Sequence, residues 1–379
     1  MKITGFLESA LHGGEILLSL VGSLGECAIV PDNLAAWNVA RAVAVIPVRP
    51  EIGAKWVELC LRSPITQRCM QTWATTTVQA TLNLRDVSKL MIPIPPKQER
   101  NIIARTLGYF DCKIQLNRRM NETLEAMARA IFKSWFVDFD PVRAKADGRE
   151  PAGMDAETAA LFPDSFEETE LGMVPNGWKI SAIGDVAKVV GGSTPSTENS
   201  RFWNGSINFA TPKDLADLSS PILLDTERRI TEEGLEHISS GLLPTGTVLL
   251  SSRAPIGYLA ITEIPVAVNQ GFIALICDGV LPNYFIIHWI RQNMDTIIGN
   301  ANGTTFLEIS KRNFRPIQLV VPSEFILKEF ALKAEALYTQ IICNQKQIRI
   351  LAAIRNALLP KLLSGDLQVE DIKIGKEEI

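Results

Sequence analysis

The residues of this chain that could do chemistry are polar side chains in turns, and they do not form a catalytic set. Asp138 and Asp140 could bind a metal ion, but no Glu/Asp-x-Lys pattern lies nearby, so we interpret them as part of a linker. The serines lack suitable histidine and aspartate partners, and no GxxxxGK[ST] phosphate loop is present. A glycine-rich S-adenosylmethionine loop and a [DNS]-P-P-[YF] motif are also missing. We therefore expect a noncatalytic protein with no cofactor and no metal ion.

The most promising turn residue is Arg253, in the segment SSRAPIG between an expected strand and a tight turn. A rigid loop can aim its guanidinium group, and no adjacent acidic residue offers an obvious structural partner. The dipeptide Asn269-Gln270 carries paired hydrogen-bond donors and acceptors. The alternative interpretation is that polar turn residues satisfy their own backbone. In either case these groups depend on the elements that hold the turns in place.

Composition indicates a protein large enough for two or more domains with hydrophobic cores. The chain has 379 residues, of which 46% are hydrophobic. The net charge of −4 does not point to a nucleic-acid binder, whose domain is often basic. Six cysteines without a CxxC pattern, and three separated histidines, offer no zinc site and indicate free thiols in a reducing compartment. No apolar run approaches the ~20 residues of a membrane span, and the first residues lack a signal-peptide pattern, so we predict a cytoplasmic protein.

Two stretches of the chain repeat each other at a constant offset. The segment TLNLRDVSKLMIPIP at 81–95 aligns with EISKRNFRPIQLVVP at 308–322 (308 − 81 = 227), and the offset continues without a gap to positions 136 and 363. A repeat of this length predicts two copies of one module. Two similar modules joined by long helices can bind two separated sites on one extended partner.

A long helix is expected after each module. Apolar residues alternate at spacings of four and three from Ile103 to Trp135, and again from Phe330 to Leu362, which is a heptad pattern. About 40 residues at ~1.5 Å each make a rod of about 60 Å. Two such rods in one chain most simply pack on each other. The expected fold class is α+β, with two repeated β-rich modules separated by two long antiparallel coiled-coil helices.

Two asparagines interrupt the apolar seams of these helices at matching positions. Asn117 and Asn344 are related by the offset of the repeat (344 − 117 = 227) and would approach each other near a pseudo-twofold axis. A polar residue in a seam costs stability but fixes register, and we predict this role for both. The alternative is that each asparagine faces solvent on a slightly rotated helix.

Several segments together resemble the specificity subunit of type I restriction–modification systems. They are SWFVDFDPV at 134–142, FPDSFEETELGMVPNGW at 162–178, the GGSTPS turn at 191–196, IPIPPKQE before the first helix and LLPKLLSGDL at the end of the second. The resemblance extends over nearly the whole chain. It implies two target-recognition domains that each bind one half of a bipartite, asymmetric double-stranded DNA site. It further implies that the helices set the spacer and dock modification (methyltransferase) subunits, which recruit restriction subunits, with no membrane partner.

The resemblance gives the following division of the chain: a partial first target-recognition domain at 1–95, the first helix at 96–137, a linker at 138–176, the second target-recognition domain at 177–322, the second helix at 323–364 and a C-terminal tail at 365–379. The linker is rich in Asp, Glu, Pro and Gly, and we expect it to drape on a neighbour rather than to form core.

A DNA-reading role assigns the turn residues to base edges and phosphates. Arg253 suits guanine, and Asn269 and Gln270 suit adenine. The other predicted contacts are Ser193, Thr194, Thr197, Lys213, Asn302, Thr304 and Thr305 in the second module and Arg41 in the first. In the first module SLVGSLG replaces SSRAPIG, so no arginine stands at the position of Arg253.

The first module is also much shorter than the second. In the second module the whole segment 178–246 precedes the strand TVLLSS, whereas in the first module only positions 1–14 precede EILLSL. We expect a specificity subunit that lacks the N-terminal half of its first recognition domain, through a wrong start codon, a split gene or a recombined fragment. An alternative function follows: a truncated remnant that binds modification subunits through its helices without reading a full bipartite site. The target sequence, and whether two copies assemble, stay open.

Overall fold

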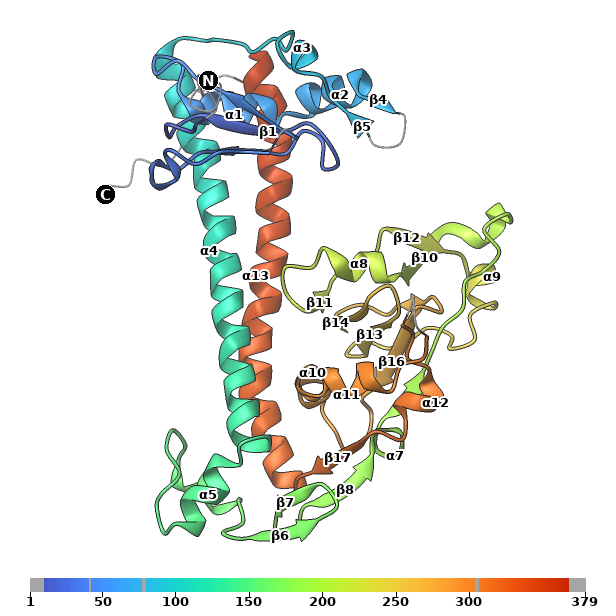
Figure 1. The fold of residues 1–379 in the computed structure, drawn as a ribbon. Helices are drawn as coiled ribbons and strands as arrows, with labels where there is room; N and C mark the ends of the chain where they lie inside the picture. The colour runs from blue at the N-terminus through green and yellow to red at the C-terminus, as the bar shows by residue number, and fades with distance from the viewer. Residues whose placement is uncertain (1–9, 41, 77–79, 304–306, 368–379) are drawn as a thin grey trace, which may run out of the picture. The chain divides into compact units, whose positions relative to one another are not determined.

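The computed structural model describes residues 10–40, 42–76, 80–303 and 307–367, and it divides into two compact units (Figure 1). Unit 1 comprises Met1–Leu116 and Gln347–Ile379, and unit 2 comprises Asn117–Lys346. Two long helices, α4 (Lys97–Phe136) and α13 (Glu324–Ser364), contribute to both units. None of the helices in the described ranges combines the length and the apolar character of a membrane span.

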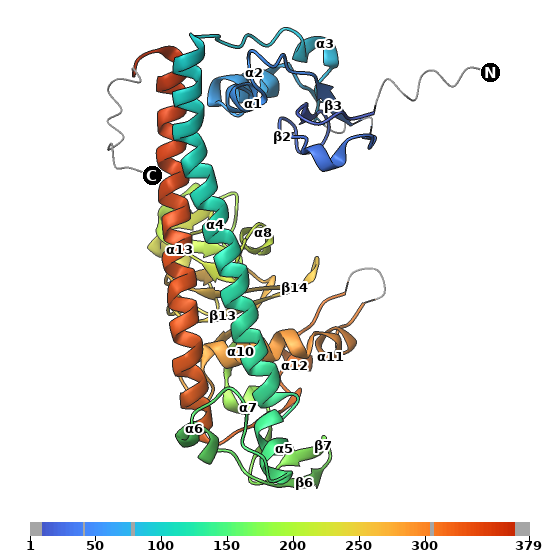
Figure 2. The same ribbon diagram turned by 90° about the vertical axis from the view of Figure 1, so that its left-hand side faces the viewer.

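The two long helices pack side by side and run antiparallel (Figure 2). In unit 1, Ile103 near the start of α4 shares a hydrophobic cluster with Leu359 and Leu362 near the end of α13. In unit 2, Phe132 near the end of α4 contacts Phe330 near the start of α13, with 5.9 Å between ring centroids. The predicted fold class, α+β with two long antiparallel helices, is confirmed.

Polar residues lie in the middle of this helix pair, within unit 2. Asn117 and Asn344 are 1% and 4% exposed, so the alternative in which they face solvent is wrong. Asn344 Nδ2 donates to Asn121 Oδ1 at 2.8 Å, one helical turn after Asn117, and Gln340 Nε2 donates to Asn344 Oδ1 at 2.9 Å. A hydrogen bond between buried amides can form only at one relative position of the helices. The register role of Asn117 and Asn344 stays a prediction.

The first module forms a small antiparallel sheet in the described part of unit 1. Its strand order is β2-β1-β3, with β1 at the centre. Ile16 and Leu18 are fully buried, because alternate residues of β1 point to one face of the sheet. The strands are β1 (Ile16–Ser19), β2 (Cys27–Ile29), β3 (Val43–Ile46), β4 (Thr75–Thr76) and β5 (Ala80–Thr81). The helices that precede α4 are η1 (Asp32–Leu34), α1 (Ala54–Leu61), α2 (Pro64–Trp73) and α3 (Leu84–Val87).

Helix α1 joins the first module to the helix pair because apolar residues lie on two of its faces. Val57 and Leu61 belong to the core under the sheet, whereas Trp56 and Leu59 pack against Ile103 of α4. The Trp56 indole nitrogen donates to the Pro93 carbonyl at 2.8 Å and ties the segment before α4 to the same helix.

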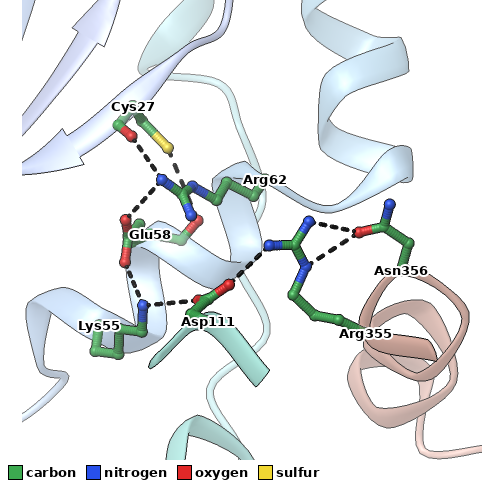
Figure 3. Close-up of polar contacts among 7 residues, drawn as sticks. All are labelled: Cys27, Lys55, Glu58, Arg62, Asp111, Arg355 and Asn356. Atoms are coloured by element: carbon green, nitrogen blue, oxygen red, sulfur yellow. Dashed lines mark hydrogen bonds and ion pairs between the residues drawn. The ribbon is translucent and has the colours of Figure 1, made fainter. Parts of the chain in front are cut away.

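A charged network lies at this junction of α1, α4 and α13 (Figure 3). Asp111 of α4 accepts from Lys55 of α1 at 3.2 Å and from Arg355 of α13 at 2.7 Å. Lys55 also donates to Glu58 at 2.9 Å, and Arg62 pairs with Glu58 at 3.1 Å. Burial alone would raise the pKa of Asp111, but the Arg355 hydrogen bond and the Lys55 charge outweigh it, so this pKa is below its usual value.

The second module contains a larger sheet, whose order within the described residues is β11-β14-β13-β16-β9. Its central strand β13 is buried on both faces: Val248 and Leu250 belong to one hydrophobic cluster and Leu249 to another. The strands of this sheet are β9 (Lys188–Val190), β11 (Ile222–Leu223), β13 (Val248–Ser252), β14 (Ile256–Thr262) and β16 (Phe272–Ile276). Two smaller sheets contain β8 (Lys179–Ala182) with β17 (Gln318–Val321), and β10 (Trp203–Ala210) with β12 (Arg228–Ile230) and β15 (Ala267–Val268).

Helices of the second module cover these sheets. Helix α10 packs its buried face between β13 and the long helices, since Phe285 contacts Phe132 of α4 at 5.2 Å between ring centroids. The helices are α7 (Ile183–Val186), η2 (Ser200–Phe202), α8 (Pro212–Ala216), α9 (Glu232–Leu235), α10 (Asn283–Gln292), α11 (Met294–Gly299) and α12 (Lys311–Phe314).

The segment 138–176 differs from the linker that its composition predicts. It forms α5 (Asp140–Ala146), α6 (Ala156–Ala160) and a hairpin of β6 (Phe166–Thr169) and β7 (Gly172–Pro175). Val142 and Phe162 are 0% and 2% exposed and belong to the main core of unit 2, where Phe162 meets Trp135 of α4. A few buried apolar side chains among many polar residues suffice to anchor this segment.

The sequence repeat corresponds to a repeat of backbone pairing. Thr75 pairs with Thr81 in the first module, and Asn302 pairs with Glu308 at the equivalent positions of the second (302 − 75 = 308 − 81 = 227). Val21 pairs with Thr81, as Arg253 pairs with Glu308. Strand β1 lies between β2 and β3 as β13 lies between β14 and β16, and among the described residues the first module has no counterparts of the outer strands β9 and β11.

Candidate nucleic-acid interface

Five loops of the second module meet at one edge of its sheets and bring most of the predicted contact residues together. They are the loop after β9 at 191–197, the turn from β10 into α8 at 211–213, the turn after β13 at 253–255, the connection from β15 to β16 at 269–271 and the described residues at 302–303 and 307–308. Asn269 N donates to the Ala210 carbonyl at 3.2 Å, and Ser252 N donates to the Gly271 carbonyl at 2.8 Å. The loops therefore form one connected surface, which we call the loop surface.

Close packing explains two glycines in these loops, against backbone at Gly192 and against a proline ring at Gly271. A Cβ atom at Gly192 would lie 1.7 Å from the Val268 carbonyl oxygen, so no other residue fits there without displacing the backbone. A Cβ atom at Gly271 would lie 2.9 Å from Pro212 Cγ. The GGSTPS turn thus lies directly on the end of β15 and the β15–β16 connection, and close packing contributes to holding the loop surface together.

Arg253 has an acidic neighbour that sequence adjacency did not show. Its Nη1 lies 3.8 Å from Glu308 Oε2, and the two side chains are 40% and 49% exposed. The sequence-based argument that Arg253 lacks an obvious structural partner is therefore wrong. Because the pair is exposed, it adds at most about 1 kcal/mol to stability, and the guanidinium group stays accessible.

Several predicted contacts hold the loop surface together in this structure. Ser193 donates its hydroxyl to the His237 carbonyl at 2.9 Å and accepts from Ser239 N at 3.0 Å. Thr194 donates to Gln270 Oε1 at 2.6 Å, which joins two loops. Asn269 Oδ1 accepts from Gly271 N at 2.9 Å, the short-range bond typical of asparagine in turns. These side chains position the loops, and their roles toward DNA stay predictions.

The remaining predicted residues are less constrained. Lys213 donates to Glu227 at 2.8 Å on the surface, and this hydrogen bond raises the pKa of the ammonium group. Thr197 is exposed, and Asn302 pairs with Glu308 through the backbone. Thr304, Thr305 and Arg41 lie outside the described residues.

Three residues on or next to the loop surface were missed from the sequence. Glu308 is the first residue of the gapless repeat, but only the fold shows that it faces Arg253. Lys311 lies against the GGSTPS turn, where its Cδ would be 3.3 Å from a Cβ at Gly191. Trp203 stacks under Arg228, whose guanidinium carbon is 3.7 Å from the ring centroid, and its indole nitrogen donates to the Ser196 carbonyl at 3.0 Å.

The chemistry available at this surface is hydrogen bonding and ion pairing. Across the described ranges, no group of three or more His, Cys, Asp or Glu side chains could hold a metal ion. Asp138 pairs with Lys133, and Asp140 begins α5. The surface presents a guanidinium group, an ammonium group, amides and hydroxyls, which are the groups that contact bases and phosphates.

Comparison with known proteins gives consistent matches across the chain. A family model of the type I restriction modification DNA specificity domain matches residues 3–126 and 175–352. The type I restriction enzyme HindI specificity subunit of Haemophilus influenzae is 29% identical over 322 residues, which are 74% of this chain and 70% of that protein. The MjaIX specificity subunit of Methanocaldococcus jannaschii is 36% identical over 292 residues, which are 76% of this chain and 62% of that protein. The chain thus spans less than two thirds of the MjaIX relative.

A solved structure supports the fold. The crystal structure of a type I restriction–modification S subunit from M. genitalium matches with a TM-score of 0.52 and 17% sequence identity, over 92% of this chain and 83% of that chain. The family model matches most of both copies of the repeat and most of both long helices, and the matched residues are well over half of the chain. The chain therefore belongs to the specificity subunits of type I restriction–modification systems, which are noncatalytic DNA-recognition subunits.

Proposed function

We propose that this chain reads a bipartite, asymmetric double-stranded DNA site, with one half-site bound by each module. The observation that carries this proposal is the loop surface, where segments far apart in the sequence present hydrogen-bonding groups on loops that contact one another. The repeat of backbone pairing at Thr81 and Glu308 supports an equivalent surface in the first module. The long helices that follow each module would set the spacer between the half-sites.

The helices would also dock modification subunits, which in turn recruit restriction subunits in the cytoplasm. In unit 1, Tyr109 and Leu116 of α4 are exposed at a spacing of seven residues, which places them on one face of the helix. In unit 2, Met120 and Met127 of α4 are exposed at the same spacing. Large apolar side chains in such rows are typical of protein interfaces.

The acidic net charge is consistent with DNA binding that is shared between this chain and the modification subunits. With a net charge of −4, the isolated chain has little general attraction for phosphates, and the loop surface supplies only a few contacts. Modification subunits would add basic surface. We expect weak DNA binding by the chain alone and tight binding by the complex, and a gel shift that shows tight, site-specific binding by the chain alone contradicts this part of the proposal.

The central experiment is co-expression with a modification subunit of the same system, followed by sequencing of methylated DNA. The expected result is one bipartite motif with a fixed spacer. Met127→Asp should weaken capture of the modification subunit and leave the thermal unfolding of the chain unchanged. Ala126→Asp is the matched control, because it adds the same charge to an exposed neighbouring position on a different side of α4. Absence of any methylated motif, with the complex intact, rules the reading function out.

A second candidate function is favoured by the smaller first module. Its sheet, within the described ranges, lacks counterparts of β9 and β11. At the backbone bridge where the second module has Arg253, the first module has Val21. The chain would then bind modification subunits without reading a full bipartite site. A methylated half-site, a palindrome formed by two copies, or no motif with an intact complex supports this function over the first.

A further inference from the structure

The loop surface contains one pair of oppositely charged side chains that is fixed by the backbone. Arg253 and Glu308 face each other across an antiparallel bridge, and Glu308 makes a second bridge with Asn302. Ile309 N donates to the Ser252 carbonyl at 3.0 Å and fixes the neighbouring rung. The two side chains therefore leave the backbone side by side, with Nη1 and Oε2 3.8 Å apart and both side chains about half exposed.

This arrangement is poorly suited to a phosphate contact. A carboxylate beside the arginine repels phosphate oxygens and offsets the attraction of the guanidinium group. It is also a weak stabiliser, since exposed ion pairs contribute about 0–1 kcal/mol. The ion pair can therefore break at little cost in free energy when a new partner binds both groups. Such a partner must offer hydrogen-bond acceptors to Arg253 and a hydrogen-bond donor to Glu308.

One base pair has that pattern in the major groove. Guanine presents the O6 and N7 acceptors, and cytosine presents the N4 amino group as a donor. O6 and N4 are hydrogen-bonded to each other within the pair, so they lie next to each other at the groove edge. We infer that Arg253 and Glu308 together read one G·C base pair, with Arg253 donating to guanine and Glu308 accepting from cytosine. This inference rests on the proposed DNA-reading function and extends it to one base pair.

The internal repeat indicates that Arg253 and Glu308 act together. The same bridge in the first module joins Val21 and Thr81, so both charges are replaced together. An apolar side chain and a hydroxyl cannot make the two charge-assisted bonds. The requirement for this G·C pair therefore belongs to the half-site of the second module.

The test uses the chain in complex with its modification subunits and measures the methylated motif and competition binding. The wild type should require one G·C pair in the second half-site, with a preference of about tenfold or more over A·T at that position. The double variant Arg253→Val/Glu308→Thr, which copies the first module, should lose the preference at that one pair and keep the rest of the motif. Arg201→Val/Glu233→Thr is the matched control, because it removes another exposed ion pair of the same module, with a 3.7 Å separation.

The single variant Glu308→Ala separates base reading from a structural salt bridge. Loss of the carboxylate should strengthen binding to nonspecific DNA and lower the ratio of specific to nonspecific affinity. A structural role would instead lower the unfolding temperature and leave that ratio unchanged. A wild-type half-site without a G·C pair, or an unchanged motif in the double variant, overturns the inference while DNA reading stands. If the wild-type complex binds no specific sequence, the proposed function fails and the inference fails with it.

Discussion

Asp111 and Tyr338 occupy the same position of the internal repeat (338 − 111 = 227). Each contacts the second residue of a helix that packs its module against the long helices, α1 for Asp111 and α10 for Tyr338. Asp111 of α4 binds the Lys55 ammonium group of α1 at 3.2 Å. Tyr338 of α13 stacks on Tyr284 of α10, with 4.7 Å between ring centroids. The two modules therefore use equivalent geometry but different chemistry, an ion pair in unit 1 and an aromatic stack in unit 2.

The charged junction predicts how unit 1 responds to substitution of Asp111. Asp111→Asn keeps the shape of the side chain but removes the anion of Arg355 and one of the two anions of Lys55, which keeps Glu58, so we expect unfolding to become easier by about 2 kcal/mol. Chemical denaturation followed by circular dichroism measures this change. Glu324→Gln, which removes an exposed ion pair with Lys328, is the control and should have little effect. Equal effects of the two variants contradict a special role of the junction.

Acid should also weaken the charged junction. The folded protein holds the pKa of Asp111 below its ordinary value of 3.8. The stabilisation is therefore present above that value and is lost as the pH falls through the lowered pKa. In Asp111→Asn this component of the acid sensitivity should disappear, which a comparison of unfolding at pH 4 and below reveals.

The aromatic junction predicts a different pH dependence for unit 2. His288 is 2% exposed, and its Nε2 lies 3.3 Å from the Tyr338 hydroxyl. Burial, with a smaller effect of Arg291 and Arg129, lowers the pKa of His288 from 6.5 to about 3. Between these two pKa values, His288 is protonated in the unfolded chain and neutral in the folded protein. Stability should fall by about 1.4 kcal/mol per pH unit as the pH decreases from about 6.5 toward 3.

Two variants test this assignment. His288→Gln keeps a hydrogen-bonding side chain that does not titrate, so the slope of unfolding free energy against pH should flatten between pH 6.5 and 5. Tyr338→Phe removes the hydroxyl group but leaves the histidine buried, so the slope should persist. A slope that is unchanged in His288→Gln means that another group causes the pH dependence.

The sequence predicted the scaffold much better than the side-chain pairing. Regular spacing of apolar residues from Ile103 to Trp135 is enough to define a long helix, and the internal repeat revealed the second. Which side chains meet across the helices depends on their relative shift along the axis, and a heptad pattern does not specify that shift. For this reason Asn121 was not identified as the hydrogen-bonding partner of Asn344.

At the candidate site, too, the sequence predicted the loops better than the side-chain contacts. Arg253, Thr194 and Gln270 were selected from turn composition, and the fold brings their loops together. Glu308 was missed because it lies far along the chain from Arg253 and only the antiparallel bridge places it opposite. The buried anchors of 138–176, such as Phe162, were missed because a mostly polar composition conceals a few core residues.

The hydrogen bond between Asn121 and Asn344 predicts a strong energetic coupling between the two long helices in unit 2. Asn344→Leu removes the donor to the buried Asn121 Oδ1, and we expect a loss of about 2 kcal/mol of unfolding free energy. The double variant Asn121→Leu/Asn344→Leu should recover most of this loss, because two apolar residues restore a continuous seam. A double-mutant cycle measures the coupling. Additive effects of the two substitutions contradict a direct partnership of these residues.

The equivalence of two backbone bridges predicts that base reading can be transferred between the modules. Val21 and Thr81 of the first module pair as Arg253 and Glu308 do in the second. In the complex with modification subunits, Val21→Arg/Thr81→Glu should add a requirement for one G·C pair to the half-site of the first module, by about tenfold or more. Val21→Arg alone should instead raise affinity for nonspecific DNA, because its charge lacks the neighbouring carboxylate. Sequencing of methylated DNA measures both outcomes, and a first half-site that is identical in the double variant and the wild type shows that the two bridges do not face DNA in the same way.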